Sequence, residues 1–428
     1  MTPVSRLAKG AYMEVFEQIE SNVRGYCRSF PTVFQSAIGS YMTDINGRHY
    51  LDFFSGAGTL NYGHNDPDMI KACIDYLGGH GILHSLDMYS QSKQQFLTAF
   101  KSTVLTPRGL DHKIQFTGPT GTNCIEAAIK LARKVTGRHA IACFTGGYHG
   151  MSLGALAITA NPAKKQSMGV QIPGVIRLPY DGVHLTDVPA QLKMLEDMFC
   201  RPGYGNDLPA AFVLEVIQGE GGIHCASHAW LQGVAALAKK LDALLIIDDI
   251  QAGNGRSGTF FSFEGSGIVP DIICISKSLS GLGLPFAITL LRPQIDIWEP
   301  AEHNGTFRGN NLAMITARIA LEKFWSDERL SKDVLYKSQQ LRQQLSEGLM
   351  GISSDFEVRG RGLMLGIAFN DITFAKKLSA QLFNEQMIAE TCGPSNEVLK
   401  CMPALTIASQ DISDGGERII KAAQTLSR

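Results

Sequence analysis

The sequence has almost no excess of charge of either sign. Its 39 basic and 40 acidic side chains give a formal net charge of −1 over 428 residues. Binding to nucleic acids and to anionic membrane surfaces depends on a strongly positive charge balance, and this composition supplies none. Chemistry on small molecules is therefore the expected class of function, with no nucleic-acid partner.

The sequence also lacks long apolar runs. A membrane-spanning helix needs roughly 18 consecutive apolar residues, and no segment approaches that length. The first residues, Met1 to Lys9, mix polar, charged and small side chains and lack the apolar core of a secretory signal. We therefore expect a cytoplasmic protein with no membrane partner.

Paired cysteines are missing as well. The nine cysteines are scattered along the chain without any Cys-x-x-Cys pair. Cys143 and Cys274 lie inside apolar runs, where a thiol behaves as a small hydrophobic side chain. The pattern argues against disulfides and against a zinc site, so no metal is expected.

The length of the chain predicts more than one domain-sized unit. Residues 1–67 are expected to form an N-terminal arm and part of a small domain, with a hairpin signal at Asn46-Gly47. Residues 68–310 are expected to form a large ligand-binding domain. Residues 311–428 are expected to complete a smaller α+β domain.

Short apolar runs alternate with amphipathic helices between residues 68 and 300. Runs that are apolar on both faces indicate the strands of a mostly parallel sheet covered by helices on both sides, so the fold class is α/β. In such sheets ligands bind at the carboxyl ends of the strands, and the chemical residues should follow each run. The runs are residues 140–144, 210–217, 243–248, 271–276 and 287–291.

One of these runs is followed directly by a lysine at the start of a turn. The run ends at Ser276, and Lys277 opens a segment rich in serine and glycine that cannot continue the strand. A lysine in partly desolvated surroundings loses some of its preference for the ammonium form, so more neutral amine is available to attack an aldehyde. Lys277 is the candidate Schiff-base lysine, although an isolated Ser-Lys-Ser is more often a solvated surface segment.

A glycine-containing loop leads into an amphipathic helix within residues 117–134. The free N–H groups and positive dipole end of such a helix can bind a phosphate, with Gly121 and Thr122 as direct contacts. The loop is neither a Gly-x-Gly-x-x-Gly fingerprint nor a Walker loop, whose lysine is missing. A simple helix cap at Thr122 is the alternative interpretation.

Two further runs end in residues suited to a cationic aromatic ring. Asp248 ends a buried run, where a carboxylate needs a cationic partner such as a protonated pyridine nitrogen. Asp249 should point to the opposite face of the strand. Tyr148 follows the run at 140–144 and two glycines, and its ring can stack on a planar cofactor. The alternatives are an acidic pair that caps a turn and a tyrosine that plugs the sheet edge.

Three polar, glycine-rich loops supply weaker candidates. Glu220 follows the run at 210–217 and can bind a substrate ammonium. Thr306 lies in a turn before a helix and can bind phosphate. The segment 55–67, which includes Ala57, has the composition of a site wall, and a plain cluster of turns has the same composition.

In this order and spacing around Lys277, these segments resemble the class III aminotransferases, which belong to the fold-type I pyridoxal-phosphate enzymes. The resemblance extends from about residue 30 to the C-terminus. It implies a seven-stranded-type sheet between helices plus a smaller α+β domain. It also implies pyridoxal 5'-phosphate as the cofactor, a small-molecule amino donor and a 2-oxo acid as substrates, and a homodimer as the minimum active unit.

The resemblance implies a role for each candidate. Lys277 would form the Schiff base and move the proton, Asp248 would pair with the pyridine nitrogen, and Tyr148 would stack on the ring. These three are the expected catalytic residues. The remaining expected cofactor contacts are Gly121, Thr122, His149, Glu215, Gln251 at the ring hydroxyl, and Thr306 of the neighbouring subunit.

The substrate side of the site departs from the family pattern. Many members carry an arginine where this chain has Lys400. The expected clamp for a substrate carboxylate is therefore a lysine without the bidentate fork of arginine, or Arg28. Glu220 and Ala57 are the other expected substrate contacts.

Within the family, these segments look most like an enzyme of ectoine synthesis that moves the terminal amino group of L-2,4-diaminobutyrate to 2-oxoglutarate. Val216-Ile217-Gln218 resembles ω-aminotransferases of ornithine or γ-aminobutyrate equally well, so those donors stay open. An aminomutase that needs no 2-oxo acid and a non-catalytic scaffold are the remaining alternatives. The combined presence of the candidate catalytic residues argues against the scaffold.

Overall fold

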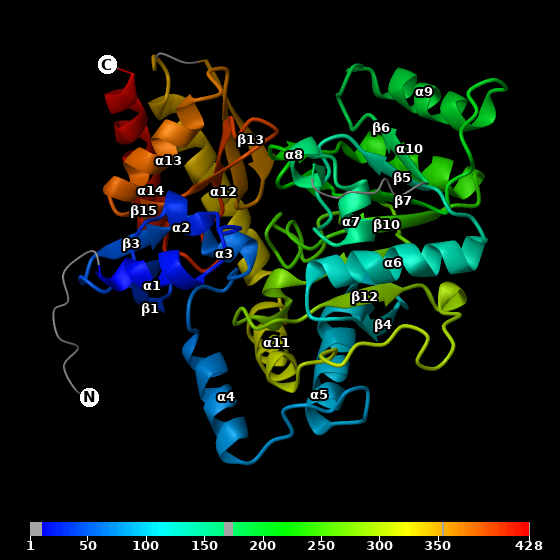
Figure 1. Cartoon of the computed structure of the whole chain (residues 1–428), viewed down its shortest axis with the longest axis horizontal. Helices are drawn as coiled ribbons and strands as arrows, with labels where there is room; N and C mark the ends of the chain where they lie inside the picture. The colour runs from blue at the N-terminus through cyan, green and yellow to red at the C-terminus, as the bar shows by residue number, and fades with distance from the viewer. Residues whose placement is uncertain (1–10, 167–173, 353–354, 428) are drawn as a thin grey trace.

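The computed structural model describes residues 11–166, 174–352 and 355–427. Figure 1 shows one large sheet with its helices and, beside it, the elements from the two ends of the chain, coloured blue and orange to red. Within the described residues, every helix is too short or too polar to cross a bilayer.

The large sheet has seven strands and is mostly parallel, as predicted. β12 is the exception, because it runs antiparallel to both of its neighbours, β11 and β4. The strand order is β4-β12-β11-β10-β7-β5-β6. The strands are β4 (Lys113–Phe116), β5 (Ile141–Phe144), β6 (Val175–Leu178), β7 (Ala211–Leu214), β10 (Leu244–Asp248), β11 (Ile272–Ile275) and β12 (Ile288–Leu291).

The apolar runs predict five of these strands and miss the two edge strands. β4 and β6 are partly exposed and carry Lys113, Gln115 and Arg177, so neither reads as a continuous apolar run. The run at 210–217 is also shorter than predicted. Its strand ends at Leu214, and Ile217–Gln218 forms a separate short strand, β8, that pairs with β9 (His224–Cys225).

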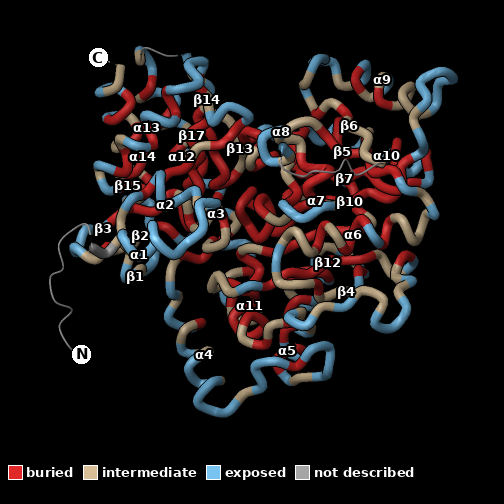
Figure 2. Tube along the Cα trace, in the orientation of Figure 1, coloured by how far each residue is buried: buried red, intermediate tan, exposed pale blue. Residues whose placement is uncertain are grey.

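Helices cover both faces of the large sheet. Ile246 of β10 belongs to one apolar core with α6 (Gly121–Thr136), whereas Leu245 and Ile247 belong to the other core with α10 (His228–Lys240). This division follows from strand geometry, because successive side chains point to opposite faces. Figure 2 shows the result as a buried layer along the sheet, with exposed residues at the periphery.

Two smaller sheets lie beside the large one. In the first, β2 and β3 pair antiparallel around Asn46-Gly47, which confirms the predicted hairpin. The orders are β1-β2-β3-β15 and β13-β14-β17-β16, and β15 pairs parallel with β3. The strands are β1 (Phe34–Ile38), β2 (Tyr41–Asp44), β3 (His49–Asp52), β13 (Phe356–Arg361), β14 (Met364–Phe369), β15 (Met387–Ile388), β16 (Glu390–Cys392) and β17 (Val398–Cys401).

Several of the remaining helices begin at a residue whose side chain caps them. The Asp66 carboxylate, for example, accepts the N–H groups of Asp68 and Met69 and so starts α4, with Pro67 at its first position. The remaining helices are α1 (Ala11–Ile19), α2 (Tyr26–Ser29), α3 (Ser55–Gly58), α4 (Pro67–Gly78), α5 (Gln91–Phe100), α7 (Leu153–Ile158), α8 (Pro162–Lys165), α9 (Val188–Cys200), α11 (Asn311–Phe324), α12 (Arg329–Gly348), α13 (Phe374–Asn384) and α14 (Ser409–Leu426).

The division of the chain into three domains stays a prediction.

Candidate active site

A cavity of ≈ 220 Å³ lies at the carboxyl ends of β5, β7, β10 and β11. Its position is the one that a parallel sheet predicts, because the loops that follow these strands converge there. Thr120, Gly150 and Ile250 form part of its lining. The predicted site residues that line it are Gly121, Thr122, Tyr148, His149, Glu215, Glu220, Asp248, Gln251 and Lys277.

Lys277 follows β11 and begins a short 3-10 turn that ends at Ser280. Its backbone has a φ of 49°, in the left-handed region. Burial, and secondarily the ammonium of Lys400, lowers the pKa of the Lys277 amine to about 8, although Glu220 and Glu390 oppose the shift. A larger share of neutral, nucleophilic amine is therefore present near neutral pH than in a solvated lysine.

Asp248 ends β10 and points into the cavity. Its Oδ2 atom lies 2.8 Å from Nδ1 of His149, and its Oδ1 atom accepts a hydrogen bond from the N–H of Ile250 at 3.2 Å. Both Asp248 and His149 are buried. The histidine therefore fixes the orientation of the carboxylate while the carboxylate still borders the cavity.

Glu215 holds the turn that carries Tyr148. Its carboxylate accepts hydrogen bonds from the backbone N–H groups of Tyr148, at 2.9 Å, and Gly219, at 3.2 Å. Burial raises the pKa of Glu215 to about 7, against the opposing effect of His149. These contacts give Glu215 a part in positioning the ring of Tyr148 at the cavity wall.

The donor set of the cavity fits pyridoxal phosphate. Gly121 and Thr122 open α6, and the first N–H groups of a helix have no intrahelical acceptor and attract an anion. Asp248 supplies a buried carboxylate for a cationic ring nitrogen. Oε1 of Gln251 is buried and without a hydrogen-bond partner among the described residues. Together with the amine of Lys277, these groups match the phosphate, nitrogen, hydroxyl and aldehyde of the cofactor.

The neighbours of Lys400 differ from those expected of a residue that binds a substrate carboxylate. Its side chain is fully buried, and its Nζ atom lies 2.7 Å from Glu220 Oε1 and 2.8 Å from Glu390 Oε1. Burial alone would lower the pKa of Lys400, but the two carboxylates hold it well above its usual range. Its charge is thus already paired. Lys400 supports Glu220, which lines the cavity, and direct contact between Lys400 and a substrate carboxylate stays a prediction that these ion pairs do not favour.

Residues 25–423 match the family described as class-III aminotransferase. The chain belongs to this family. It is 50% identical over 408 residues to a diaminobutyrate–2-oxoglutarate transaminase of Halalkalibacterium halodurans, with 94% of each chain covered. It is 48% identical over 404 residues to a protein of the same name from Vibrio cholerae, with 94% of this chain and 98% of that protein covered.

Solved structures give the same result for the fold of this aminotransferase. The ornithine aminotransferase of Toxoplasma gondii has a TM-score of 0.84 at 25% identity, over 99% of this chain and 96% of that chain. A transaminase of the marine bacterium Virgibacillus has a TM-score of 0.86 at 18% identity, over 97% and 99%. The predicted family, fold type I and pyridoxal-phosphate cofactor are confirmed.

Three predicted residues of the aminotransferase lie at or beyond the edge of this cavity. The carbonyl of Ala57 accepts a hydrogen bond from Nε2 of Gln251 at 3.1 Å, which places Ala57 next to a lining residue. Arg28 is exposed and donates to the carbonyl of Arg24. Thr306 is exposed too, and its contribution to the site of a neighbouring subunit stays a prediction.

The sequence patterns missed Glu390 in the aminotransferase. This residue follows the apolar stretch Met387-Ile388-Ala389 and is buried, so an acid at the end of an apolar run was the available signal. The run is short and lies far from the five segments, which is why it was not recognised. Burial raises the pKa of Glu390 despite the nearby ammonium of Lys400.

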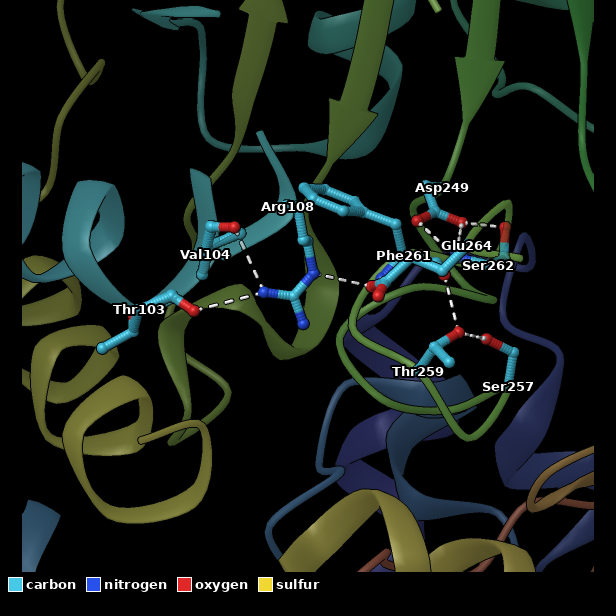
Figure 3. A network of polar contacts seen from close by, with 9 residues as sticks. All are labelled: Thr103, Val104, Arg108, Asp249, Ser257, Thr259, Phe261, Ser262 and Glu264. Carbon is cyan, nitrogen blue, oxygen red and sulfur yellow. Dashed lines mark hydrogen bonds and ion pairs between the residues drawn. The ribbon is translucent and has the colours of Figure 1, made fainter. Parts of the chain in front are cut away.

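Asp249 of the aminotransferase points away from Asp248, as strand geometry predicts. Figure 3 shows its carboxylate directed at the loop after β10, where the N–H of Ser262 donates to it at 3.1 Å and the hydroxyl of Ser262 also donates. In the same loop Glu264 binds Nε of Arg108 at 2.8 Å. Asp249 therefore anchors the loop behind the site rather than the site itself.

We expect Asp249 to make the enzyme less stable as pH rises. Burial raises the pKa of Asp249 to about 7 from an ordinary value of 3.8. Because the folded-state pKa is the higher one, the stabilisation is complete below about pH 3.8 and is lost as pH rises through about 7. Urea unfolding at pH 5 and pH 8 measures the change in the free energy of unfolding between the two pH values. This change should be smaller for Asp249→Asn than for the wild type.

The exposed Asp207 supplies the control for this measurement. Asp207→Asn removes an acid of the same type without removing a buried carboxylate, so its stability difference between the two pH values should equal that of the wild type. An Asp249→Asn protein with the wild-type pH dependence would contradict the assignment.

Proposed function

We propose that this aminotransferase is a diaminobutyrate–2-oxoglutarate transaminase. It takes the terminal amino group from L-2,4-diaminobutyrate, which becomes L-aspartate 4-semialdehyde, and gives it to 2-oxoglutarate, which becomes L-glutamate. The observation that carries the reaction class is the convergence of Lys277, Asp248 and the start of α6 on one cavity. The choice of donor is supported by relatives of that name that cover almost the whole chain.

The residues of the cavity have separate tasks in this reaction. When bound, pyridoxal phosphate supplies an electron-withdrawing ring that makes the proton on the amine-bearing carbon easier to remove. The amine of Lys277 would accept this proton and return it on the other side of the transferred nitrogen, at the aldehyde carbon of the cofactor. Asp248 would place its carboxylate beside the ring nitrogen, and the N–H groups of Gly121 and Thr122 would bind the phosphate.

Glu220 is the residue that we assign to the second ammonium of the donor. Lys400 lowers the pKa of Glu220 below its ordinary value, although burial alone would raise it, so the carboxylate remains ionised. Glu220 and Glu390 place two acidic groups around the single ammonium of Lys400. This side of the cavity therefore favours a substrate with a second cationic group over a monoamine such as γ-aminobutyrate.

The test is a half-reaction with single donors. The cofactor-loaded enzyme is mixed with L-2,4-diaminobutyrate, L-ornithine or γ-aminobutyrate, and the absorbance of the aldehyde form of the cofactor is followed. We expect the first donor to remove this absorbance at least about tenfold faster than ornithine, because one methylene in a shaped pocket is worth roughly that factor. Addition of 2-oxoglutarate should restore it.

The outcomes separate the remaining candidates. Faster reaction with ornithine would replace the proposed donor, and the fold shared with the ornithine aminotransferase of Toxoplasma gondii makes this the second candidate. Turnover without 2-oxoglutarate would identify an aminomutase. Absence of any absorbance change with all three donors would contradict the assignment of the donor class.

We further propose that the active unit is a homodimer in the cytoplasm. The nine cysteines are free thiols, as in a reducing compartment. Large apolar side chains are exposed close to Thr306, among them Phe307 at 69% and Leu83 at 51%, and a second copy of the chain would cover them. Sedimentation as a monomer at micromolar concentration would contradict the dimer.

A further inference from the structure

The backbone at Lys277 adopts a conformation that lysine does not favour. Its φ of 49° lies in the left-handed region, which is strained for a residue with a Cβ atom. Such a conformation persists only where the surrounding structure determines it. The groups that fix the amine of Lys277 are therefore expected on the residues on either side of it.

Both neighbours of Lys277 are buried serines with fixed hydroxyl groups. The Ser276 hydroxyl donates to the carbonyl of Phe286 at 2.9 Å. The Ser278 hydroxyl donates to the carbonyl of Gly58 at 2.7 Å. The residues before and after Lys277 are thus held from two directions.

Asn61 connects these two serines. Its backbone N–H donates to the Ser278 hydroxyl at 3.1 Å. Its Nδ2 group donates to the carbonyl of Asn254 at 2.9 Å, and Nδ2 of Asn254 donates to the carbonyl of Ser276 at 3.2 Å. Asn61 and Asn254 are 1% and 2% exposed, so water does not compete for these bonds.

Arg256 holds the remaining side-chain atom of Asn61. Its Nε and Nη2 groups donate to Oδ1 of Asn61 at 3.2 and 2.6 Å. Its Nη1 group donates to the carbonyls of Leu363 and Pro403 at 3.0 and 2.5 Å. Arg256 is fully buried, and its pKa is lowered to about 9 by that burial. A guanidinium with this many fixed acceptors cannot rotate without breaking several bonds at once.

We propose that Asn61 is a positioning residue that holds the amine of Lys277 in the cavity by fixing the residues on both sides of it. The inference rests on the role proposed for Lys277. Asn61 does not line the cavity, so it acts through Ser276 and Ser278 and not by touching substrate. Loss of its contacts releases the turn, and the Lys277 side chain moves toward solvent.

Asn61→Asp separates positioning from stability. A carboxylate still accepts the N–H groups of Arg256, and it gives this buried guanidinium an acidic partner. It cannot donate to the carbonyl of Asn254, so the connection to Ser276 is lost. We expect thermal stability close to that of the wild type together with a loss in kcat of about tenfold or more, since small misplacements of a reacting group have effects of that size.

Ser278→Ala is the second variant, and it leaves the charge unchanged. It removes the hydroxyl that bonds Gly58 and accepts from Asn61. Ser266→Ala is its matched control, because the Ser266 hydroxyl is also buried and makes the same two kinds of bond. It donates to the carbonyl of Phe263 and accepts the backbone N–H of Ile268. The control loses equivalent bonds away from Lys277 and should keep the wild-type kcat.

The decisive readout uses the enzyme without cofactor. Amine-labelling by trinitrobenzenesulfonate is measured against pH, and labelled Lys277 is quantified by mass spectrometry. The wild-type midpoint is expected at about pH 8, because burial holds the pKa of Lys277 there. In Asn61→Asp and Ser278→Ala the midpoint should rise by about one pH unit or more as the amine becomes hydrated. In Ser266→Ala it should not move.

An unchanged midpoint in both site variants, with kcat within twofold of the wild type, would overturn the proposal. A raised midpoint in Asn61→Asp alone would also count against it, because the new carboxylate would raise that pKa by its charge. Attachment of the cofactor to another lysine, found by borohydride reduction and mass spectrometry, would instead remove the role proposed for Lys277. The two failures are therefore distinguishable.

Discussion

Lys277→Ala is expected to reduce the proposed amino transfer from diaminobutyrate to 2-oxoglutarate by at least about 10³-fold, since both the nucleophile and the proton carrier are lost. The fold should survive. Burial lowers the pKa of the Lys277 amine, which means that the ammonium form is an unfavourable occupant of the cavity. Removal of the side chain therefore removes the free-energy cost of burying the ammonium at neutral pH, and it leaves the apolar cores unchanged.

The measurement is glutamate formation, with thermal unfolding of the cofactor-free proteins as the test of the fold. Lys165→Ala serves as the control, because burial also lowers the pKa of Lys165, which lies outside the cavity lining. It should retain activity within a few-fold of the wild type. Appreciable turnover in Lys277→Ala would refute the site, whereas collapse of its unfolding transition would refute the predicted independence of the fold.

The second large effect is expected for Lys400→Met, which leaves the buried carboxylate of Glu390 and the half-buried carboxylate of Glu220 without their shared ammonium. Removal of one partner from a buried ion pair typically costs about 3–5 kcal/mol, since the remaining charge is left uncompensated. One of the two acids must then take up a proton. The loss in free energy of unfolding should therefore be larger at pH 8 than at pH 5.5, and urea unfolding at both values measures it.

Lys337→Met is the matched control for this variant. Lys337 is buried as well, but its carboxylate partner, Asp333, is 45% exposed and can be hydrated once the lysine is gone, whereas Glu390 beside Lys400 is only 7% exposed. We expect the smaller loss there. Lys400→Met combined with Glu390→Gln should recover part of the stability, because only Glu220 then needs a partner, and a double variant less stable than Lys400→Met would argue against the shared ion pair.

The carboxyl ends of the central strands could be predicted from the sequence, because a buried apolar run and a chemically active side chain are adjacent in the sequence there. Asp248 and Lys277 each follow a continuous apolar run, so the position of the strand also gave the position of the side chain. The edge strands β4 and β6 could not be found in this way. One side of an edge strand is open, and Lys113 and Arg177 break the apolar pattern.

The partner of a buried charge cannot be read from the sequence around it. Lys400 lies on β17, yet its two acids come from the loop after β8 and from β16. Asn61 was likewise one polar residue in a glycine-rich loop. Its contacts with Ser278, Asn254 and Arg256 exist only after three distant segments have packed together.

The parallel pairing of β3 with β15 places a constraint on how the chain is made. The register joins Leu51 to Met387, so the last strand of the first small sheet is synthesised only after most of the chain has left the ribosome. At ordinary rates of translation this delay is on the order of tens of seconds. During that time β3 presents an unpaired edge to other nascent chains. Protection of residues 49–52 by a chaperone during this interval would therefore increase the yield of this enzyme.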